Sequence, residues 1–200
     1  MSATLVLMRH GESIWNREKR LTGSVDVPLT DKGRRDAARA AENCPGLSFD
    51  VAYCSPLSRA RETAELFLEA LGCAAVPLIP EPLLVEKNYG ILQGLNKELV
   101  KERYGERAYA LWHRSYEIGP PGGESLRELS LRVHPFFNQV IAEDVRLGKN
   151  VLLVAHGNVI RCLVMLLEQL SPEEISTVEI GTAEPRLYRL DRDLRPADGD

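Results

Sequence analysis

Two short apolar runs of this chain both end in a histidine followed by a glycine. Residues 5–12 read LVLMRHGE, and residues 152–158 read LLVAHGN. Each run is typical of a buried strand that stops where glycine and polar residues begin. Ligands of open α/β sheets gather outside the carboxyl ends of the strands, where loops from different strands converge. We therefore expect the two histidines, His10 and His156, to lie together in one site.

Strand-like and helix-like segments alternate along the rest of the chain. Strands are predicted at residues 4–8, 49–54, 75–79, 151–155 and 186–190. Helices are predicted at residues 31–43, 56–72, 97–104, 108–116 and 159–170, with two more beginning at Ser125 and Ser171. Pro135 predicts a kink in the helix that begins at Ser125. This alternation predicts an α/β fold, a three-layer α/β/α sandwich with a mostly parallel central sheet.

Two segments depart from the alternation. A glycine-bearing stretch, residues 86–125, is predicted to be an insertion over one face of the sheet and above the site. Residues 191–200, DRDLRPADGD, are predicted to be a polar tail without core-building residues. At 200 residues, one domain with these two additions accounts for the whole chain.

The charge balance excludes some classes of partner. The chain has 29 acidic and 25 basic residues, a formal net charge of -4, so it has no overall basic field for nucleic acid or an anionic membrane. Its four cysteines form no C-x-x-C pair, which favours reduced thiols over a zinc or disulfide site. The first residues lack the pattern of a signal peptide, so we expect a cytoplasmic protein.

The residues near the first histidine favour phosphate chemistry. Arg9 precedes His10, and the segment SPLSRARET supplies Arg59 and Arg61. Guanidinium groups bind phosphate oxygens in pairs, and a neutral imidazole beside them can attack phosphorus and become phosphohistidine. Because Arg59 and Arg61 point in different directions from one helix, we expect at least one of them at the surface. A single strand-end histidine is also compatible with a structural role, but two in matched contexts favour a site.

Both histidines are followed by glycine, which is predicted to let the backbone approach the ligand closely. The helix expected after His156 would also present free N–H groups to an anion. Phosphoryl transfer further needs a proton donor for the leaving oxygen. Glu86 is a candidate, and Glu12 and Glu62 are alternatives that spacing alone does not exclude.

Six segments, in order, resemble the cofactor-dependent phosphoglycerate mutases of the histidine phosphatase superfamily. They are LVLMRHGESIWN, TGSVDVPLTDKG, SPLSRARET, EKNYGILQGLNK, WHRSYEIGPP and LLVAHGN. The resemblance covers nearly the whole chain. RHGE indicates only the superfamily, whereas NYGILQGLNK and WHRSYEIGPP indicate the mutase branch.

This resemblance implies roles for individual residues. His10 is the implied phosphorylated nucleophile and Glu86 the implied general acid and base, with Arg9, Arg61 and His156 around the phosphoryl group. The implied substrate-binding residues are Ser13, Asn16, Thr22, Gly23, Tyr89, Lys97, His113, Arg114, Gly157 and Asn158. For several of these an ordinary structural role is the alternative: a surface charge, a packed aromatic ring or a loop-forming side chain.

The implied activity is the interconversion of 3-phosphoglycerate and 2-phosphoglycerate in glycolysis and gluconeogenesis, with 2,3-bisphosphoglycerate as phosphate donor and no metal. The implied partners are small phosphoglycerates, with neither nucleic acid nor membrane, and a homodimer is expected. The alternatives are a phosphatase that uses the same phosphohistidine and a protein that binds a phosphorylated ligand without turnover.

The chain departs from the family pattern at three places. Lys87 and Asn88 stand where the mutases usually have Arg-His, and His113 stands where they usually have arginine. These changes imply weaker substrate binding, or binding that depends on pH through His113. The chain also lacks the longer C-terminal tail of many members, so we expect appreciable hydrolysis of the phosphohistidine.

Overall fold

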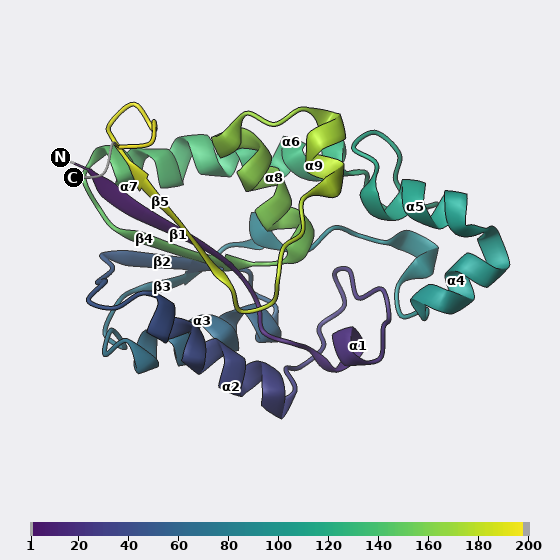
Figure 1. Cartoon of the computed structure of the whole chain (residues 1–200), viewed down its shortest axis with the longest axis horizontal. Coiled ribbons are helices and arrows are strands. Elements are labelled where there is room, and N and C mark those ends of the chain that lie inside the picture. The colour runs from purple at the N-terminus through teal and green to yellow at the C-terminus, as the bar shows by residue number, and fades with distance from the viewer. Residues whose placement is uncertain (1, 198–200) are drawn as a thin grey trace.

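The computed structural model describes residues 2–197 and places the predicted strands in one five-stranded sheet (Figure 1). The strands are β1 (Ala3–Arg9), β2 (Val51–Cys54), β3 (Leu78–Pro80), β4 (Val151–Ala155) and β5 (Pro185–Leu190). Their order is β3-β2-β4-β1-β5, and only β5 runs antiparallel to its neighbour. The predicted fold class is therefore confirmed.

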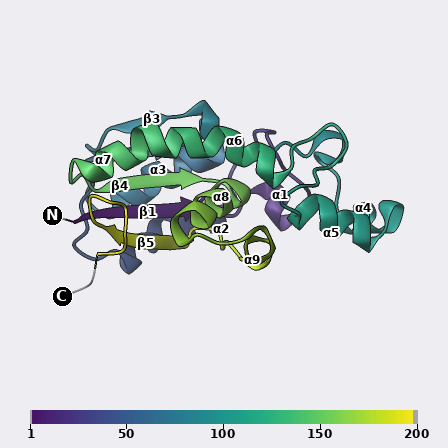
Figure 2. The same cartoon turned by 90° about the horizontal axis from the view of Figure 1, so that it is seen from above.

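Helices cover both faces of the sheet (Figures 1 and 2). One face carries α2 (Asp31–Arg39) and α3 (Ser58–Ala70), and the other carries α6 (Leu126–Phe136), α7 (Ala142–Arg146) and α8 (Gly157–Glu168). The side chain of Thr30 caps α2, as predicted. Directly after Pro135, which cannot donate a backbone hydrogen bond, α6 gives way to the π-helix η4 (Phe137–Ile141) before α7.

Several shorter helices join these elements. They are α1 (Ile14–Arg17), η1 (Ala40–Asn43), η2 (Pro82–Leu84), η3 (Gly90–Leu92), α4 (Lys97–Tyr104), α5 (Glu106–Arg114) and α9 (Pro172–Thr177). Of these, the four-residue α1 and the 3-10 helices η2 and η3 were not predicted, because one turn is too short to show helical periodicity.

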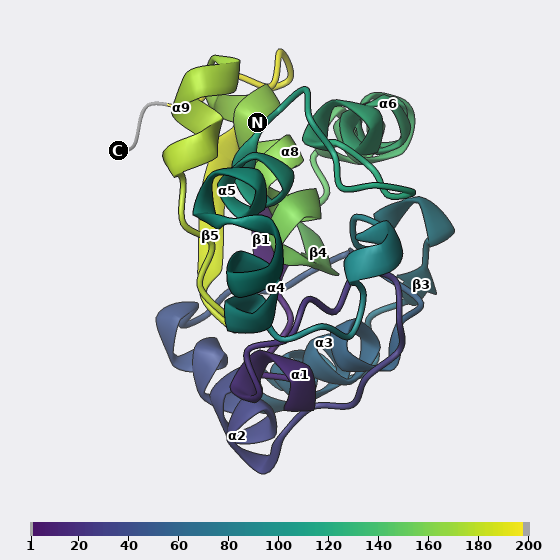
Figure 3. The same ribbon diagram turned by 90° about the vertical axis from the view of Figure 1, so that its right-hand side faces the viewer.

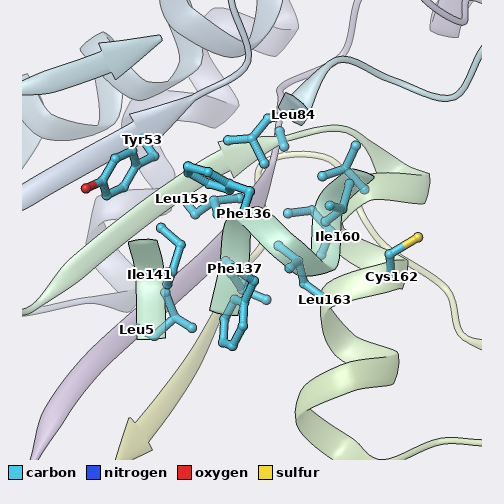
Figure 4. Close-up of a cluster of buried hydrophobic side chains, with 14 of the residues drawn as sticks. Leu5, Tyr53, Leu84, Phe136, Phe137, Ile141, Leu153, Ile160, Cys162 and Leu163 are labelled. Atoms are coloured by element: carbon cyan, nitrogen blue, oxygen red, sulfur yellow. The ribbon is translucent and has the colours of Figure 1, made fainter. Parts of the chain in front are cut away.

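The apolar strands alternate their side chains between two cores. In β1, Leu5 and Leu7 face the cluster under α6 and α8, whereas Val6 and Met8 face the cluster under α2 and α3. Figure 4 shows the first cluster, in which Leu153 of β4 packs among the side chains of α6 and α8. Because both faces are covered, β1 and β4 read as continuous apolar runs. Truncating a fully buried leucine such as Leu153 to alanine is expected to cost about 2–5 kcal/mol.

The insertion lies beyond the carboxyl ends of the strands (Figures 1 and 3). Helices α4 and α5 form most of it, and its buried side chains Tyr89, Leu92 and Val100 pack with Leu21 from the loop after α1. The predicted position over one face of the sheet is wrong, because these apolar side chains form a small core of their own.

The tail also differs from its prediction. Leu194 packs against the larger core, and the backbone N–H of Ala197 donates to the carbonyl of Arg189 at 2.8 Å, which folds residues 191–197 back along β5. Residues 198–200 of the predicted tail lie outside the described residues. Within residues 2–197 no helix has the length and apolar character needed to cross a bilayer.

Candidate active site

The parallel register of β1 and β4 brings the two histidines together. Arg9 is the register partner of Ala155, so the next residue on each strand, His10 and His156, also lie side by side. The backbone N–H of His10 donates to the carbonyl of Ala155 at 2.9 Å. The two ring centroids are 5.1 Å apart with the planes inclined by 64°. The expectation that both His-Gly segments meet in one place is confirmed.

The hydrogen bonds of His10 prepare one ring nitrogen for attack. Its Nδ1 lies 2.7 Å from the carbonyl oxygen of Gly11. Because a carbonyl only accepts, Nδ1 carries the proton and Nε2 keeps its lone pair. Burial, followed by the nearby charges of Arg59 and Arg9, holds the pKa of His10 well below its ordinary value. The ring is therefore neutral at physiological pH, the form that a nucleophile needs.

His156 supports the site from the neighbouring strand. Its Nε2 lies 2.8 Å from the hydroxyl of Ser55, and its Nδ1 is buried without a hydrogen-bond partner. Burial lowers the pKa of His156, and the charge of Arg59 lowers it further, so this ring is neutral as well. A neutral ring with one unpartnered nitrogen can still donate to or accept from a ligand.

Arg59 is the arginine of α3 that reaches the histidines. Its Nε lies 3.3 Å from Nε2 of His10, and its two terminal nitrogens donate to the carbonyls of Val25 and Gly23 at 2.8 and 2.9 Å. The residue is 1% exposed. Burial lowers its pKa to about 10, so it keeps its charge at neutral pH. These contacts fix a positive charge beside the attacking nitrogen.

The expectation that Arg61 belongs to this cluster is wrong. Its side chain is 63% exposed and pairs with Glu65 at 2.8 Å on the next turn of α3. Arg61 instead borders a separate cavity between α3 and β3. Residues two apart on a helix point about 200° away from each other, so only one of Arg59 and Arg61 can face the sheet. The expectation that at least one of them lies at the surface is confirmed.

Arg9 approaches from the end of β1. Its Nη1 donates to the carbonyl of Ile180 at 2.8 Å, whereas its Nε is buried without a partner. Within residues 2–197, three buried side-chain atoms lack a hydrogen-bond partner: Nε of Arg9, Oγ1 of Thr22 and Nδ1 of His156. Buried polar groups are normally paired. Their concentration around His10 indicates a place built for a polar ligand.

Glu86 reaches the same cavity from the start of the insertion. Its Oε1 accepts the backbone N–H of Lys87 at 2.7 Å, and its Oε2 accepts the backbone N–H of Asn158 at 3.3 Å. Arg132 donates to the backbone carbonyl of Glu86 at 3.3 Å and pairs with Glu124, which holds this segment against α6. The carboxyl group is thus fixed between the insertion and the beginning of α8.

The two alternative proton donors are engaged elsewhere. Glu12 accepts a hydrogen bond from the hydroxyl of Thr30 at 2.8 Å, and Glu62 pairs with Arg34 at 2.6 Å. Neither of them lines the cavity that contains His10. Among the three glutamates considered, the structure therefore favours Glu86.

A model of the histidine phosphatase superfamily (branch 1) matches residues 5–195. A 2,3-bisphosphoglycerate-dependent phosphoglycerate mutase of Azorhizobium caulinodans is 48% identical over 195 residues, covering 96% of this chain and 95% of that protein. A second protein of that name, from Gloeobacter violaceus, is 47% identical, covering 96% of this chain and 87% of its own.

The chain belongs to the histidine phosphatase superfamily, branch 1. Solved structures agree with this assignment. Bacillus stearothermophilus YhfR superposes with a TM-score of 0.83 at 26% identity, covering 94% of this chain and 92% of the other. The mycobacterial glucosyl-3-phosphoglycerate phosphatase superposes with a TM-score of 0.81 at 27% identity, covering 94% and 90%.

In this histidine phosphatase, most of the expected residues line one cavity of about 150 Å³ at the carboxyl edge of the sheet. Those that do are Arg9, His10, Asn16, Thr22, Gly23, Glu86, Tyr89, Lys97, His113, Arg114, Gly157 and Asn158. Two larger cavities, of about 440 and 450 Å³, contain no histidine. Chemistry rather than size therefore identifies the site.

Ser13 and the glycine after His10 have structural tasks instead. Ser13 is fully buried and caps α1 in a capping box with Asn16, and it does not line the cavity. A side chain at Gly11 would lie 2.4 Å from the carbonyl oxygen of Gly33 in α2. The close approach that Gly11 permits is thus to α2, and its predicted approach to the ligand is wrong.

Sequence reasoning missed several lining residues: Arg20, Leu21, Arg161, Glu179 and Ile180. Arg161 is 5% exposed and donates to Oδ1 of Asn158 at 2.8 Å, while Nδ2 of Asn158 donates to the hydroxyl of Tyr89 at 3.2 Å. An arginine within the apolar pattern of α8, three residues after Asn158, was an available signal. Glu179 and Ile180 lie in a loop and gave none.

The two departures from the family pattern occupy different environments. Lys87 is 1% exposed, donates to the carbonyl of Trp112 at 2.8 Å and lies 5.0 Å from the centroid of the Tyr89 ring. His113 lines the cavity, and burial together with Lys97 and Arg114 lowers its pKa to about 3. His113 is therefore neutral near physiological pH, and the expectation that it makes binding pH-dependent there is wrong.

The described residues include no group of three or more histidine, cysteine, aspartate or glutamate side chains that could hold a metal ion. The positive charge of this site comes from its own side chains. The described residues that line the cavity include six cations and two carboxylates: Arg9, Arg20, Arg59, Lys97, Arg114, Arg161, Glu86 and Glu179. A chain with a net charge of -4 thus concentrates positive charge around His10.

Proposed function

We propose that this chain interconverts 3-phosphoglycerate and 2-phosphoglycerate, with 2,3-bisphosphoglycerate as the primer that phosphorylates His10. The excess of cations in the cavity carries the proposal. Arg9 and Arg59 serve one anionic group beside His10, while Lys97 and Arg114 from the insertion supply charge for a second group. A ligand with two phosphates, or with a phosphate and a carboxylate, matches this arrangement.

The first transfer uses the neutral ring of His10. Its Nε2 attacks one phosphorus of the bisphosphate, a nitrogen–phosphorus bond forms, and the bond from phosphorus to the substrate oxygen breaks. The departing oxygen takes a proton from the carboxyl group of Glu86, which leaves a monophosphoglycerate. Arg9 and Arg59 balance the negative charge that develops on the transferring group.

The second transfer reverses these roles. A hydroxyl of the monophosphoglycerate attacks the phosphohistidine and gives its proton to the Glu86 carboxylate, and His10 returns to its neutral form. When the phosphate returns to the other hydroxyl, the net result is isomerisation. The arginines provide the charge stabilisation in this scheme, which includes no metal. The reaction places the chain in glycolysis and gluconeogenesis.

Two relatives at 47% and 48% identity that bear the mutase name support this proposal over hydrolysis. Hydrolysis is the second candidate, because the similar solved structure at 27% identity bears the name of a phosphatase. The two activities differ only in whether a hydroxyl of the substrate or water attacks the phosphohistidine. A cytoplasmic location and a homodimer stay predictions.

The test supplies purified protein with 3-phosphoglycerate and a trace of 2,3-bisphosphoglycerate and follows 2-phosphoglycerate and free phosphate together. The proposal predicts that 2-phosphoglycerate appears much faster than phosphate and only with the primer. Phosphate release without isomerisation would identify a phosphatase. If neither product forms, and labelled bisphosphate leaves no phosphate on the protein, the chain binds such ligands without turnover. His10→Ala is the matched inactive control.

A further inference from the structure

Glu179 lies opposite the insertion, in the loop between α9 and β5. Its Oε1 is 2.6 Å from Nη2 of Arg114, at the end of α5, and the preceding carbonyl of Val178 is 3.5 Å from Nη1 of the same guanidinium. Both residues line the cavity that contains His10. An acidic side chain therefore occupies the arginine that the proposed reaction assigns to the substrate.

The two carboxylates of the cavity differ in how firmly they are held. Glu86 is 9% exposed and accepts two backbone N–H groups, whereas the side chain of Glu179 is 79% exposed and its hydrogen bond is to Arg114. An exposed carboxylate with one partner can leave that partner at little cost, because water solvates it at once. Glu179 is thus a removable acid.

Glu179 also acts on other cations of the cavity. Burial lowers the pKa values of Arg9, Lys97 and Arg161, and the negative charge of Glu179 opposes this lowering at all three. Its carboxylate therefore lies where four positive charges converge. A second anionic group of a ligand would be drawn to the same place, and two anions cannot share Arg114 without repulsion.

We propose that Glu179 is a built-in counter-anion, which neutralises the cation cluster of the empty site and must leave Arg114 before the anionic group of the substrate can bind there. The inference rests on the proposed function, because that function assigns Arg114 to the substrate. Glu179 then lowers affinity for doubly anionic ligands without taking part in phosphoryl transfer. It sets the substrate concentration at which the site fills, and it speeds release of the product.

The test compares calorimetric binding of 3-phosphoglycerate, without primer, to wild type, Glu179→Gln and Glu65→Gln. Glutamine keeps the size of the side chain and an acceptor for Arg114 but removes the charge. Glu65 is a matched control, because it is a half-exposed glutamate paired with an arginine at 2.8 Å outside the site. We expect Glu179→Gln to lower the Kd about threefold to tenfold and Glu65→Gln to change it less than about twofold.

A charge effect is separated from a structural one by salt. Removing Glu179 raises the net positive charge of the cavity, so the Kd of Glu179→Gln should rise more steeply than that of wild type between about 0.02 and 0.2 M salt. Glu179→Asp keeps the charge and should stay near wild type. Thermal unfolding of each variant checks that the fold is intact.

Unchanged or weaker binding by Glu179→Gln would overturn the inference, since a residue that orients Arg114 for the substrate would weaken binding when replaced. Failure of the proposed function is seen separately, in wild type alone. If wild type binds 3-phosphoglycerate but does not isomerise it, the mutase proposal fails while the ratio of Kd values still decides the role of Glu179. If wild type and Glu179→Gln both fail to bind it, both proposals are overturned.

Discussion

The Nε of Arg59 lies 3.3 Å from Nε2 of His10, the nitrogen that the proposed reaction phosphorylates. The terminal nitrogens of Arg59 are held by the carbonyls of Gly23 and Val25, so its guanidinium keeps one position. A phosphoryl group arriving at Nε2 meets an N–H donor that is already in place. Such a preorganised donor needs no rearrangement during the transfer.

Replacing Arg59 with alanine should therefore lower kcat/KM for isomerisation about 10²- to 10³-fold, because one fixed cation at the transferring group is lost. Arg61→Ala is the matched control on the same helix and should stay within about twofold of wild type, since its partner is a surface glutamate. Initial rates with 3-phosphoglycerate and primer provide the comparison. A large loss for Arg61→Ala with little loss for Arg59→Ala would reverse the assignment made here.

Glu86→Gln should reduce kcat about 10²- to 10⁴-fold, because glutamine still accepts the N–H groups of Lys87 and Asn158 but holds no transferable proton. Glu62→Gln serves as control, since Glu62 pairs with Arg34 away from the cavity. Single-turnover dephosphorylation of the phosphohistidine measures the step directly. Near-normal turnover by correctly folded Glu86→Gln would remove Glu86 from the mechanism.

Lys87 makes stability depend on pH in a predictable direction. Burial, aided by the charge of Arg161, lowers its pKa from 10.5 to about 8 in the folded chain, while Glu86 opposes the shift. Between these values the unfolded chain keeps a proton that the folded chain has lost, so the free energy of unfolding rises with pH. The rise contributed by Lys87 is of order 2–4 kcal/mol between pH 8 and 10.5.

Urea unfolding of wild type and Lys87→Met over this pH range tests the expectation. Methionine keeps the apolar stem of the side chain and removes the titrating group. Lost contacts shift the whole curve of the variant, whereas titration changes the difference between the two curves. That difference should grow in favour of wild type as the pH rises. Parallel curves would show that the lysine is not perturbed in the folded chain.

The sequence was most informative where one physical constraint acts alone. Both faces of β4 are buried, so its apolar run marked the strand at residues 151–155, and the parallel register of β1 and β4 then placed His10 beside His156. Strand β3 was displaced from its predicted residues 75–79 to Leu78–Pro80. It pairs only with β2, at the edge of the sheet, and its half-exposed side chains give a weak apolar signal.

The choice between Arg59 and Arg61 shows where a usable signal was overlooked. Thr63 and Phe67 follow Arg59 at intervals of four along the buried face of α3, whereas Arg61 and Glu65 occupy the exposed face. The apolar residues of that helix could therefore have identified Arg59. Glu179 is different, because its position depends on where a loop passes α5, which no local pattern encodes.

The most direct test of the account is the site of phosphorylation. Protein incubated with 2,3-bisphosphoglycerate labelled in its phosphates should acquire an acid-labile, base-stable label, and peptide mapping should place it on His10. His10→Ala should take up none, while His156→Ala should keep His10 as the site and label more slowly. Acid-labile phosphate retained by His10→Ala, or found on His156 in wild type, would contradict the assignment of His10 as nucleophile.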